Sequence, residues 1–169
     1  MRNTSIFLLL SASLLLWACP PVDDESCMAL DAPSINLGQG VGSAFEPFVD
    51  DQEVGLSVAP QGGFGVSTRI ATMGLRAGEN EYVDVLMETR IDDDVTGSFL
   101  LEAARLLCRG DGLGGLITSV VVGFDPDIYR TNDDLLALDG SSVVLDVTVT
   151  GADDTSAEFQ QPLVVVVGG

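Results

Sequence analysis

From residue 33 onward the chain consists of short segments in which apolar and polar residues alternate, and this pattern restricts its fold more than any other feature. In residues 82–91, Val83, Val85 and Met87 fall on one side of an extended chain, and charged residues fall on the other. Residues 143–150 repeat the pattern, with valine and leucine against aspartate and threonine. A period of two with one polar face is typical of a half-buried antiparallel strand. The region is therefore expected to be mainly β-structure.

Glycine, aspartate and proline divide these segments into units of strand length. We expect strands at 34–37, 54–58, 66–75, 82–91, 116–124, 143–150 and 163–167. Short strands separated by regular turn signals are typical of sandwiches rather than of helical or mixed folds. The sequence thus predicts an all-β fold, a single antiparallel β-sandwich of about seven strands.

Residues 98–109 are compatible with two secondary structures. Ser98, Glu102, Arg105 and Arg109 are spaced by four, three and four residues, which places them on one polar stripe of a helix. Read as a strand, the segment alternates poorly. A chain of antiparallel strands nevertheless favours a strand here, and context often overrides local propensity. We favour the strand by a narrow margin and keep a helix at 98–109 as the alternative.

The last third of the chain contains one more helical signal and a recognisable hairpin. Residues 133–138 predict a short helical turn, with Asn132 or Asp133 as its cap. The following pattern, 138–150, then a turn and a final strand, resembles the last hairpin of immunoglobulin-like domains, which implies an immunoglobulin-like sandwich. The buried tryptophan of antibody domains has no counterpart, since Trp17 is the only tryptophan.

The first nineteen residues have the pattern of an export signal. Arg2 precedes an apolar run from Ile6 to Trp17, and a small residue follows. The run is about twelve residues, short of the roughly 20 that span a bilayer. The closing motif Leu16-Trp17-Ala18-Cys19 resembles the lipobox of bacterial lipoproteins, which implies that Cys19 is acylated and becomes the mature N-terminus. A retained anchor helix, or ordinary secretion with Cys19 as a free thiol, are the alternatives.

These boundaries predict a signal peptide at 1–18, a lipidated acidic tether at 19–32 and one domain at 33–169. Two prolines after Cys19 and a run of acidic residues keep the tether irregular and solvated. Cys27 and Cys108 remain as an even pair in an exported chain, which predicts a disulfide. Two reduced, buried thiols are the alternative.

The composition excludes several kinds of partner and chemistry. The formal net charge is −19, and there is no histidine and no lysine. Without histidine there is no Ser-His-Asp or Cys-His centre and no imidazole metal ligand. Without lysine there is no Schiff base and no lysine of a P-loop. A chain this acidic repels nucleic acid and anionic lipid headgroups. Codon bias and salt tolerance account for this charge better than a charge-based function does.

Two short motifs resemble a pattern in uncharacterised lipoproteins of myxobacteria and their relatives. They are Ala44-Phe45-Glu46-Pro47 and, further on, Ala59-Pro60-Gln61-Gly62-Gly63-Phe64. Those proteins tend to carry a histidine near the position of Phe64 and Gly65, and this chain has none. The resemblance implies a lipoprotein and names no activity.

Two groups of residues are candidate sites. Asp125, Asp127, Asp133 and Asp134 could together supply oxygen ligands to calcium, although their spacing is not that of an EF-hand. Aspartates also favour turns by bonding their own backbone, which is the alternative. Phe45, Phe48, Gln61 and Phe64 could form an aromatic binding patch on the loops at 43–53 and 59–65, with core packing as the alternative.

Together these features predict a cell-envelope lipoprotein with a non-catalytic binding or structural role, anchored through Cys19 in the outer membrane or at the cell surface. Its partners would be the membrane, through the N-terminal lipid, and an envelope protein or polysaccharide, but not nucleic acid. No cofactor is expected, with calcium as the one possibility. The alternative is a calcium-dependent carbohydrate-binding module or a carboxylate-based hydrolase that uses the acidic loops.

Overall fold

The computed structural model describes Cys27 and residues 31–58, 63–110 and 114–168. Strands dominate it, and the single short helix is α1, Asn132–Leu136. The all-β prediction is confirmed. The strands are β1 (Ser34–Gln39), β2 (Glu46–Pro47), β3 (Gln52–Val58), β4 (Phe64–Met73), β5 (Tyr82–Ile91), β6 (Asp94–Arg105), β7 (Leu107–Cys108), β8 (Gly115–Gly123), β9 (Ser142–Gly151) and β10 (Ser156–Val166).

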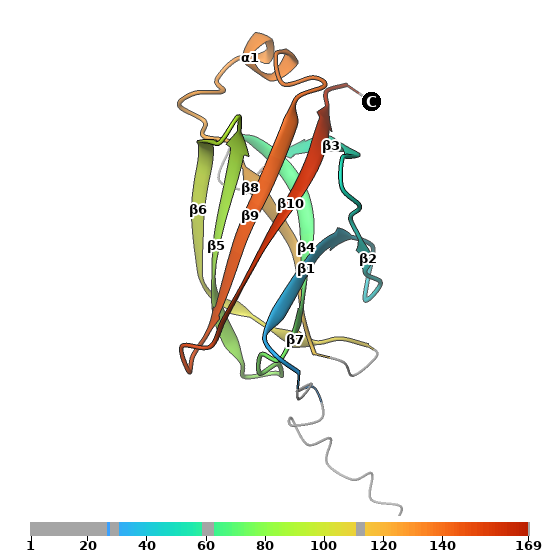
Figure 1. Ribbon diagram of the computed structural model, residues 1–169, viewed down its shortest axis with the longest axis vertical. Coiled ribbons are helices and arrows are strands. Elements are labelled where there is room, and N and C mark those ends of the chain that lie inside the picture. Colours follow the sequence, from blue (N-terminus) through green and yellow to red (C-terminus); the bar gives the residue numbers. More distant parts are fainter. Residues whose placement is uncertain (1–26, 28–30, 59–62, 111–113, 169) are drawn as a thin grey trace, which may run out of the picture.

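The strands form a sandwich whose order is that of immunoglobulin-like domains (Figure 1). One sheet has the order β1-β4-β8-β7, with β2 added at its edge. The other has the order β6-β5-β9-β10. These orders correspond to the ABED sheet and to the CFG sheet with one additional edge strand. All seven expected strands are present, and β6 and the two-residue strands β2 and β7 complete the set.

Strand β3 connects the two sheets. Its first half pairs in parallel with β10, from Gln52 opposite Leu163 to Gly55 opposite Val166. Its second half pairs antiparallel with β4, beginning with Leu56 opposite Val66. The chain thus crosses from one sheet to the other within a single strand, and the two sheets separate next to this crossing.

The core follows from the alternation seen in the sequence. In β9 the side chains of Val143, Leu145, Val147 and Val149 are fully buried, while their neighbours remain partly exposed. Because side chains alternate between the faces of a strand, each sheet turns one apolar face toward the other. The apolar side chains of both sheets merge into one hydrophobic cluster.

The ambiguous segment is a strand, so the helix at 98–109 is wrong. Strand β6 pairs with β5, and Leu100 lies opposite Leu86. The polar residues of the supposed helical stripe, such as Glu102 and Arg105, lie on the exposed face of this edge strand. A bulge disturbs the alternation: Ala103 has a φ of 51°, and its N–H donates to the Asp84 carboxylate at 2.9 Å. The helical spacing of the polar residues was misleading, because a bulge shifts which positions of a strand face the solvent.

The helical turn expected near 133–138 is confirmed as α1, but the expected cap is wrong. Thr131, rather than Asn132 or Asp133, is the N-cap, and its hydroxyl oxygen accepts from the Asp134 N–H. The Asp134 carboxylate accepts in return from the Thr131 N–H at 2.8 Å. Thr131 is the N-cap because Asp134, three residues later, supplies the carboxylate that completes a capping box.

The two ends of the sandwich are occupied by different parts of the chain (Figure 1). Helix α1 and the end of β10 lie at one end, and the start of β1 and strand β7 lie at the other. At the β7 end, Cys27 is joined to Cys108 with a Cα–Cα distance of 5.4 Å, as the cysteine pairing predicted. The chain therefore enters the domain at the end opposite α1.

Candidate binding groove

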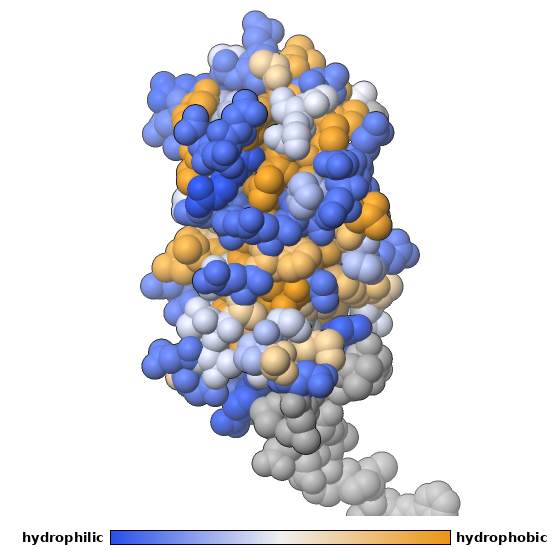
Figure 2. All heavy atoms as spheres, in the orientation of Figure 1, coloured by the Kyte–Doolittle hydropathy of each residue, from blue (hydrophilic) through white to orange (hydrophobic). Residues whose placement is uncertain are grey.

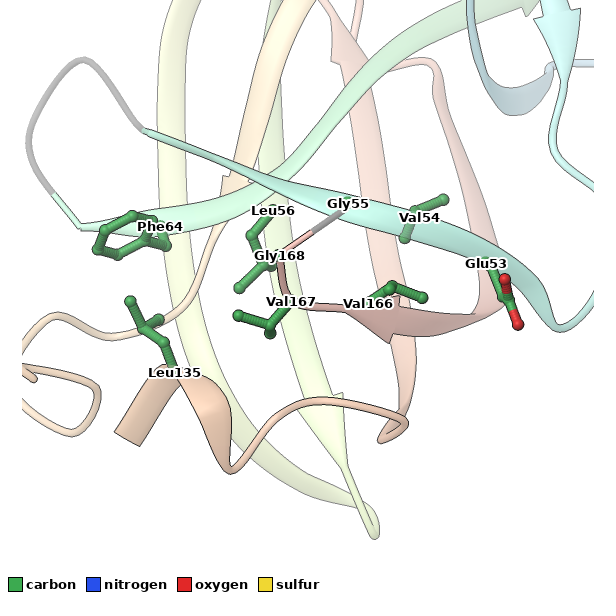
Figure 3. A pocket seen from close by; sticks show the side chains of 9 residues that line it. All are labelled: Glu53, Val54, Gly55, Leu56, Phe64, Leu135, Val166, Val167 and Gly168. Carbon is green, nitrogen blue, oxygen red and sulfur yellow. The ribbon is translucent and has the colours of Figure 1, made fainter. Parts of the chain in front are cut away.

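An apolar groove opens at the α1 end of the sandwich (Figure 3). Its volume is about 480 Å³, which lies within the range of ligand-binding sites. Four segments far apart in the sequence line it: Glu53, Val54, Gly55 and Leu56 of β3, Phe64 of β4, Leu135 of α1, and Val166, Val167 and Gly168 at the end of β10. Apart from Glu53, the lining side chains are apolar.

The groove lies where β3 leaves the end of β10. The last paired residues are Gly55 and Val166, and from Leu56 onward β3 pairs with β4 instead. Val167 and Gly168 therefore continue without a partner on β3, and the space between the diverging chains is the groove. Gly55 is one of the lining residues, and a Cβ at this position would find no atom within 4 Å.

The wall on the helix side is held by hydrogen bonds. The capping box fixes the first turn of α1, from which Leu135 packs into the core with 6% of its surface exposed. The Asp139 carboxylate accepts from the Val167 N–H at 2.8 Å and so ties the end of β10 to the segment after α1. Phe64 packs against the core from the other side. These contacts hold the walls of the groove in place, so the groove is part of the fold itself.

The surroundings of the groove are acidic. Glu53 lines it, Asp139 is bonded to its Val167, and both side chains are exposed. Hydrogen bonds from the backbone and the hydroxyl of Thr131 lower the pKa of Asp134, which keeps this carboxylate charged. Figure 2 shows hydrophilic side chains over much of the α1 end, with apolar groups exposed between them. The site thus combines an apolar floor with a negative rim.

Three of the four aspartates of the calcium hypothesis make local hydrogen bonds. Asp125 accepts from the Asp127 N–H at 2.7 Å, Asp127 pairs with Arg130 at 2.8 Å, and Asp134 caps α1. Asp133 is exposed in the first turn of α1. Among the described residues, no group of three or more acidic or cysteine side chains is placed to hold a metal ion.

The aromatic residues expected to form one patch lie in three settings. Phe48 belongs to the core with 7% of its surface exposed, so core packing describes it correctly. Phe45 is half-buried, and the Cζ atom of Arg109 lies over its ring, 5.8 Å from the ring centroid. Phe64 lines the groove. Gln61 and the lipidation candidate Cys19 lie outside the described residues.

No pattern in the sequence pointed to the role of Arg69. Its side chain is 9% exposed, and Nη1 donates to the carbonyl oxygens of Gly42 and Ala44 at 2.8 and 2.7 Å. Arg69 lines a second, more polar hollow of about 530 Å³ between β1 and β4. Because these backbone carbonyls engage the guanidinium, Arg69 is best explained as the residue that holds the loop after β1 in place.

Sequence reasoning located Phe64 but not the remaining residues of the groove. Gly55 was the one available signal, since a glycine inside a strand pattern often marks a site where something approaches the backbone. The pairing of β3 with β10 joins segments more than 100 residues apart, and no local pattern reveals it.

Comparisons with known proteins do not assign this chain to a family. No protein-family model matches the chain, and no curated protein matches it either. Over the part of the chain that the structure describes, no helix is both long and apolar enough to cross a membrane. The groove, the disulfide and the sequence motifs are therefore the basis for a functional proposal.

Proposed function

We propose that this chain is a cell-envelope lipoprotein, held through lipidated Cys19 at the outer membrane or the cell surface. Its immunoglobulin-like domain binds a partner without catalysis, and the groove at the α1 end is the binding site. The anchor and the groove then serve one purpose, which is to present a binding surface at a fixed distance from the membrane.

The observation that carries this proposal is the opposition of the two ends. Cys27 follows Cys19 by eight positions and is bonded to Cys108 at the β7 end. Eight residues span at most about 29 Å even when fully extended. A lipid on Cys19 would therefore keep the β7 end near the bilayer, and the groove would face away from it (Figure 1).

The chemistry of the groove supports binding rather than catalysis. Glu53 is the only titratable side chain among its lining residues. A general acid–base or nucleophilic mechanism needs at least a second group within hydrogen-bond reach of the first. An apolar floor with one charged group at its edge is instead the composition of a recognition site.

Metabolic labelling tests the anchor. Cells that express the chain are grown with radioactive palmitate, and the protein is then immunoprecipitated. The intact chain is expected to carry label and to fractionate with membranes, and Cys19→Ala is expected to lose both properties. Cys27→Ala is the matched control, since it removes a cysteine eight positions away and should keep the label. An unlabelled intact chain, or a labelled Cys19→Ala variant, contradicts the proposal.

A further inference from the structure

We infer that the ligand of the groove is a basic, apolar segment of a partner protein. Its apolar side chains would enter the groove, and its lysine or arginine side chains would meet the carboxylates on the rim. This inference rests on the proposed function, because it names the class of partner for the same site. It follows from the apolar surface, the charge and the shape of the α1 end.

Exposed apolar side chains adjoin two of the segments that line the groove. Val58, just after the groove residues of β3, has 71% of its surface exposed, and Leu136, next to Leu135, has 58% exposed. Exposed apolar surface that adjoins a groove and is rimmed by polar groups is typical of an interaction site.

The charge determines which apolar partner fits. Glu53 lines the groove and Asp139 is bonded to its Val167, and the chain has no lysine or histidine to balance them. Arg130, the arginine nearest to α1 in sequence, is bonded to Asp127 at 2.8 Å. Complementary potentials guide association, so a cationic segment is attracted to this end and an anionic one is repelled.

The distribution of these groups favours a polypeptide over a small amphiphile. The two carboxylates come from separate segments, Glu53 from β3 and Asp139 from the segment after α1. A small amphiphile has one head group and can meet only one of them. A peptide segment carries several charges along its length and can meet both while it fills the groove.

Fluorescence anisotropy with designed peptides tests the inference. The probe is a labelled peptide of alternating leucine and lysine, titrated with the mature chain, residues 19–169, with its disulfide formed. Two comparison peptides replace lysine by glutamate or leucine by serine. The leucine–lysine peptide is expected to bind at least about tenfold more tightly than either. Because no lipid is present, this outcome is independent of whether Cys19 is an anchor.

Two pairs of variants place the binding in the groove. Gly55→Phe projects a ring into open space and is expected to weaken binding at least about tenfold, whereas Thr148→Phe on the outer face of β9 should not change it. Glu53→Gln is expected to weaken binding about threefold or more. Glu158→Gln removes an equally exposed charge from the far half of β10 and should have little effect. Circular dichroism confirms that each variant is folded.

Each other result overturns the inference in a defined way. Equal binding of the serine–lysine peptide, or equal effects of Glu53→Gln and Glu158→Gln, means non-specific charge attraction. Equal binding of the leucine–glutamate peptide means that the rim does not select charge. Unchanged binding to Gly55→Phe means that the peptide lies elsewhere. Displacement of the peptide by dodecylamine at similar affinity means that the site takes small cationic amphiphiles.

Discussion

The two ends of the sandwich differ in how closely the chain is packed, although the same strands run between them. At the β7 end the chains are in close contact: the disulfide joins Cys27 to Cys108, and Gly114 leaves no room for a side chain against the backbone oxygen of Thr72. At the α1 end the sheets part beside β3, and Gly55 faces open space. One end is thus closed by a covalent bond, and the other is open.

This comparison shows that the groove does not result from poor packing of the core. The fully buried side chains of β9 run along the strand, from Val143 near the groove to Val149 near the other end. The difference lies instead in how the strands terminate, since β3 changes sheets at one end and a covalent bond closes the other. Substitutions at the two ends should therefore have different consequences, and these can be measured.

The largest effect is expected from removing the covalent bond at the closed end. The disulfide spans 81 positions, and the chain-entropy model assigns a loop of this size about 4 kcal/mol of stability. The Cys27→Ser/Cys108→Ser double variant should lose about this amount in urea unfolding. Cys19→Ser removes a cysteine outside the loop and should leave stability unchanged. A loss below about 1 kcal/mol would show that the β7 end does not depend on this bond.

A glycine pair tests the contrast in packing. Gly114 has a φ of +97°, and a Cβ there would overlap the Thr72 carbonyl oxygen. Gly114→Ala should therefore cost about 2–3 kcal/mol in thermal or urea unfolding, through strain and overpacking. Gly55→Ala meets nothing and should change stability by less than about 0.5 kcal/mol. Similar losses in both variants would remove the distinction between a tight and an open end.

A smaller effect is expected from the helix that walls the groove. Thr131→Ala removes the N-cap of α1 and should cost about 1 kcal/mol in urea unfolding. Thr131→Ser is the matched control, since it keeps the hydroxyl oxygen that accepts from the Asp134 N–H, and it should retain most of the stability. If Thr131→Ala has no effect on stability, α1 is not held by its cap.

The smallest effect is a pH dependence from the same capping box. Hydrogen bonds from Thr131 lower the pKa of Asp134 in the folded protein, so its contribution is complete above the pKa of the unfolded chain. The contribution is lost as the pH falls through the lowered, folded-state pKa. Asp134→Asn should therefore reduce the slope of stability against pH below the ordinary aspartate pKa of 3.8. An unchanged acid slope would contradict the hydrogen-bonded cap.

The sequence predicted the fold well because its signals are local. Alternation in residues 82–91 matched β5 without correction, and the single polar face identified the sandwich. Strand β6 was uncertain because a bulge at Ala103 displaced its polar residues into a helical spacing. The cap of α1 was misplaced by one or two residues, since three adjacent polar residues are each able to cap.

The candidate site was predicted much less well, for a different reason. Phe64 was singled out as an aromatic residue near a turn, but Glu53, Leu135 and Val167 were not. They meet only because β3 pairs with the end of β10 and α1 folds against both. The acidic pairs, which looked most like a ligand site in the sequence, bond to nearby backbone and to Arg130. A run of aspartates is thus more informative about turns than about metals.

Single tryptophans test the central claim, that the anchor and the groove lie at opposite ends, most directly. The mature chain contains no tryptophan, because Trp17 lies in the predicted signal peptide. Leu107→Trp reports on the β7 end and Leu136→Trp on the α1 end, and both leucines are exposed. In vesicles that contain a dansyl-labelled lipid, energy transfer from the tryptophan measures its proximity to the bilayer.

The lipidated protein is predicted to transfer strongly from Leu107→Trp and weakly from Leu136→Trp. The ten-residue strand β5 alone spans about 33 Å, so the two positions should be clearly distinguished. Equal transfer, or stronger transfer from Leu136→Trp, would contradict the account, because the groove would then lie against the membrane rather than facing a partner.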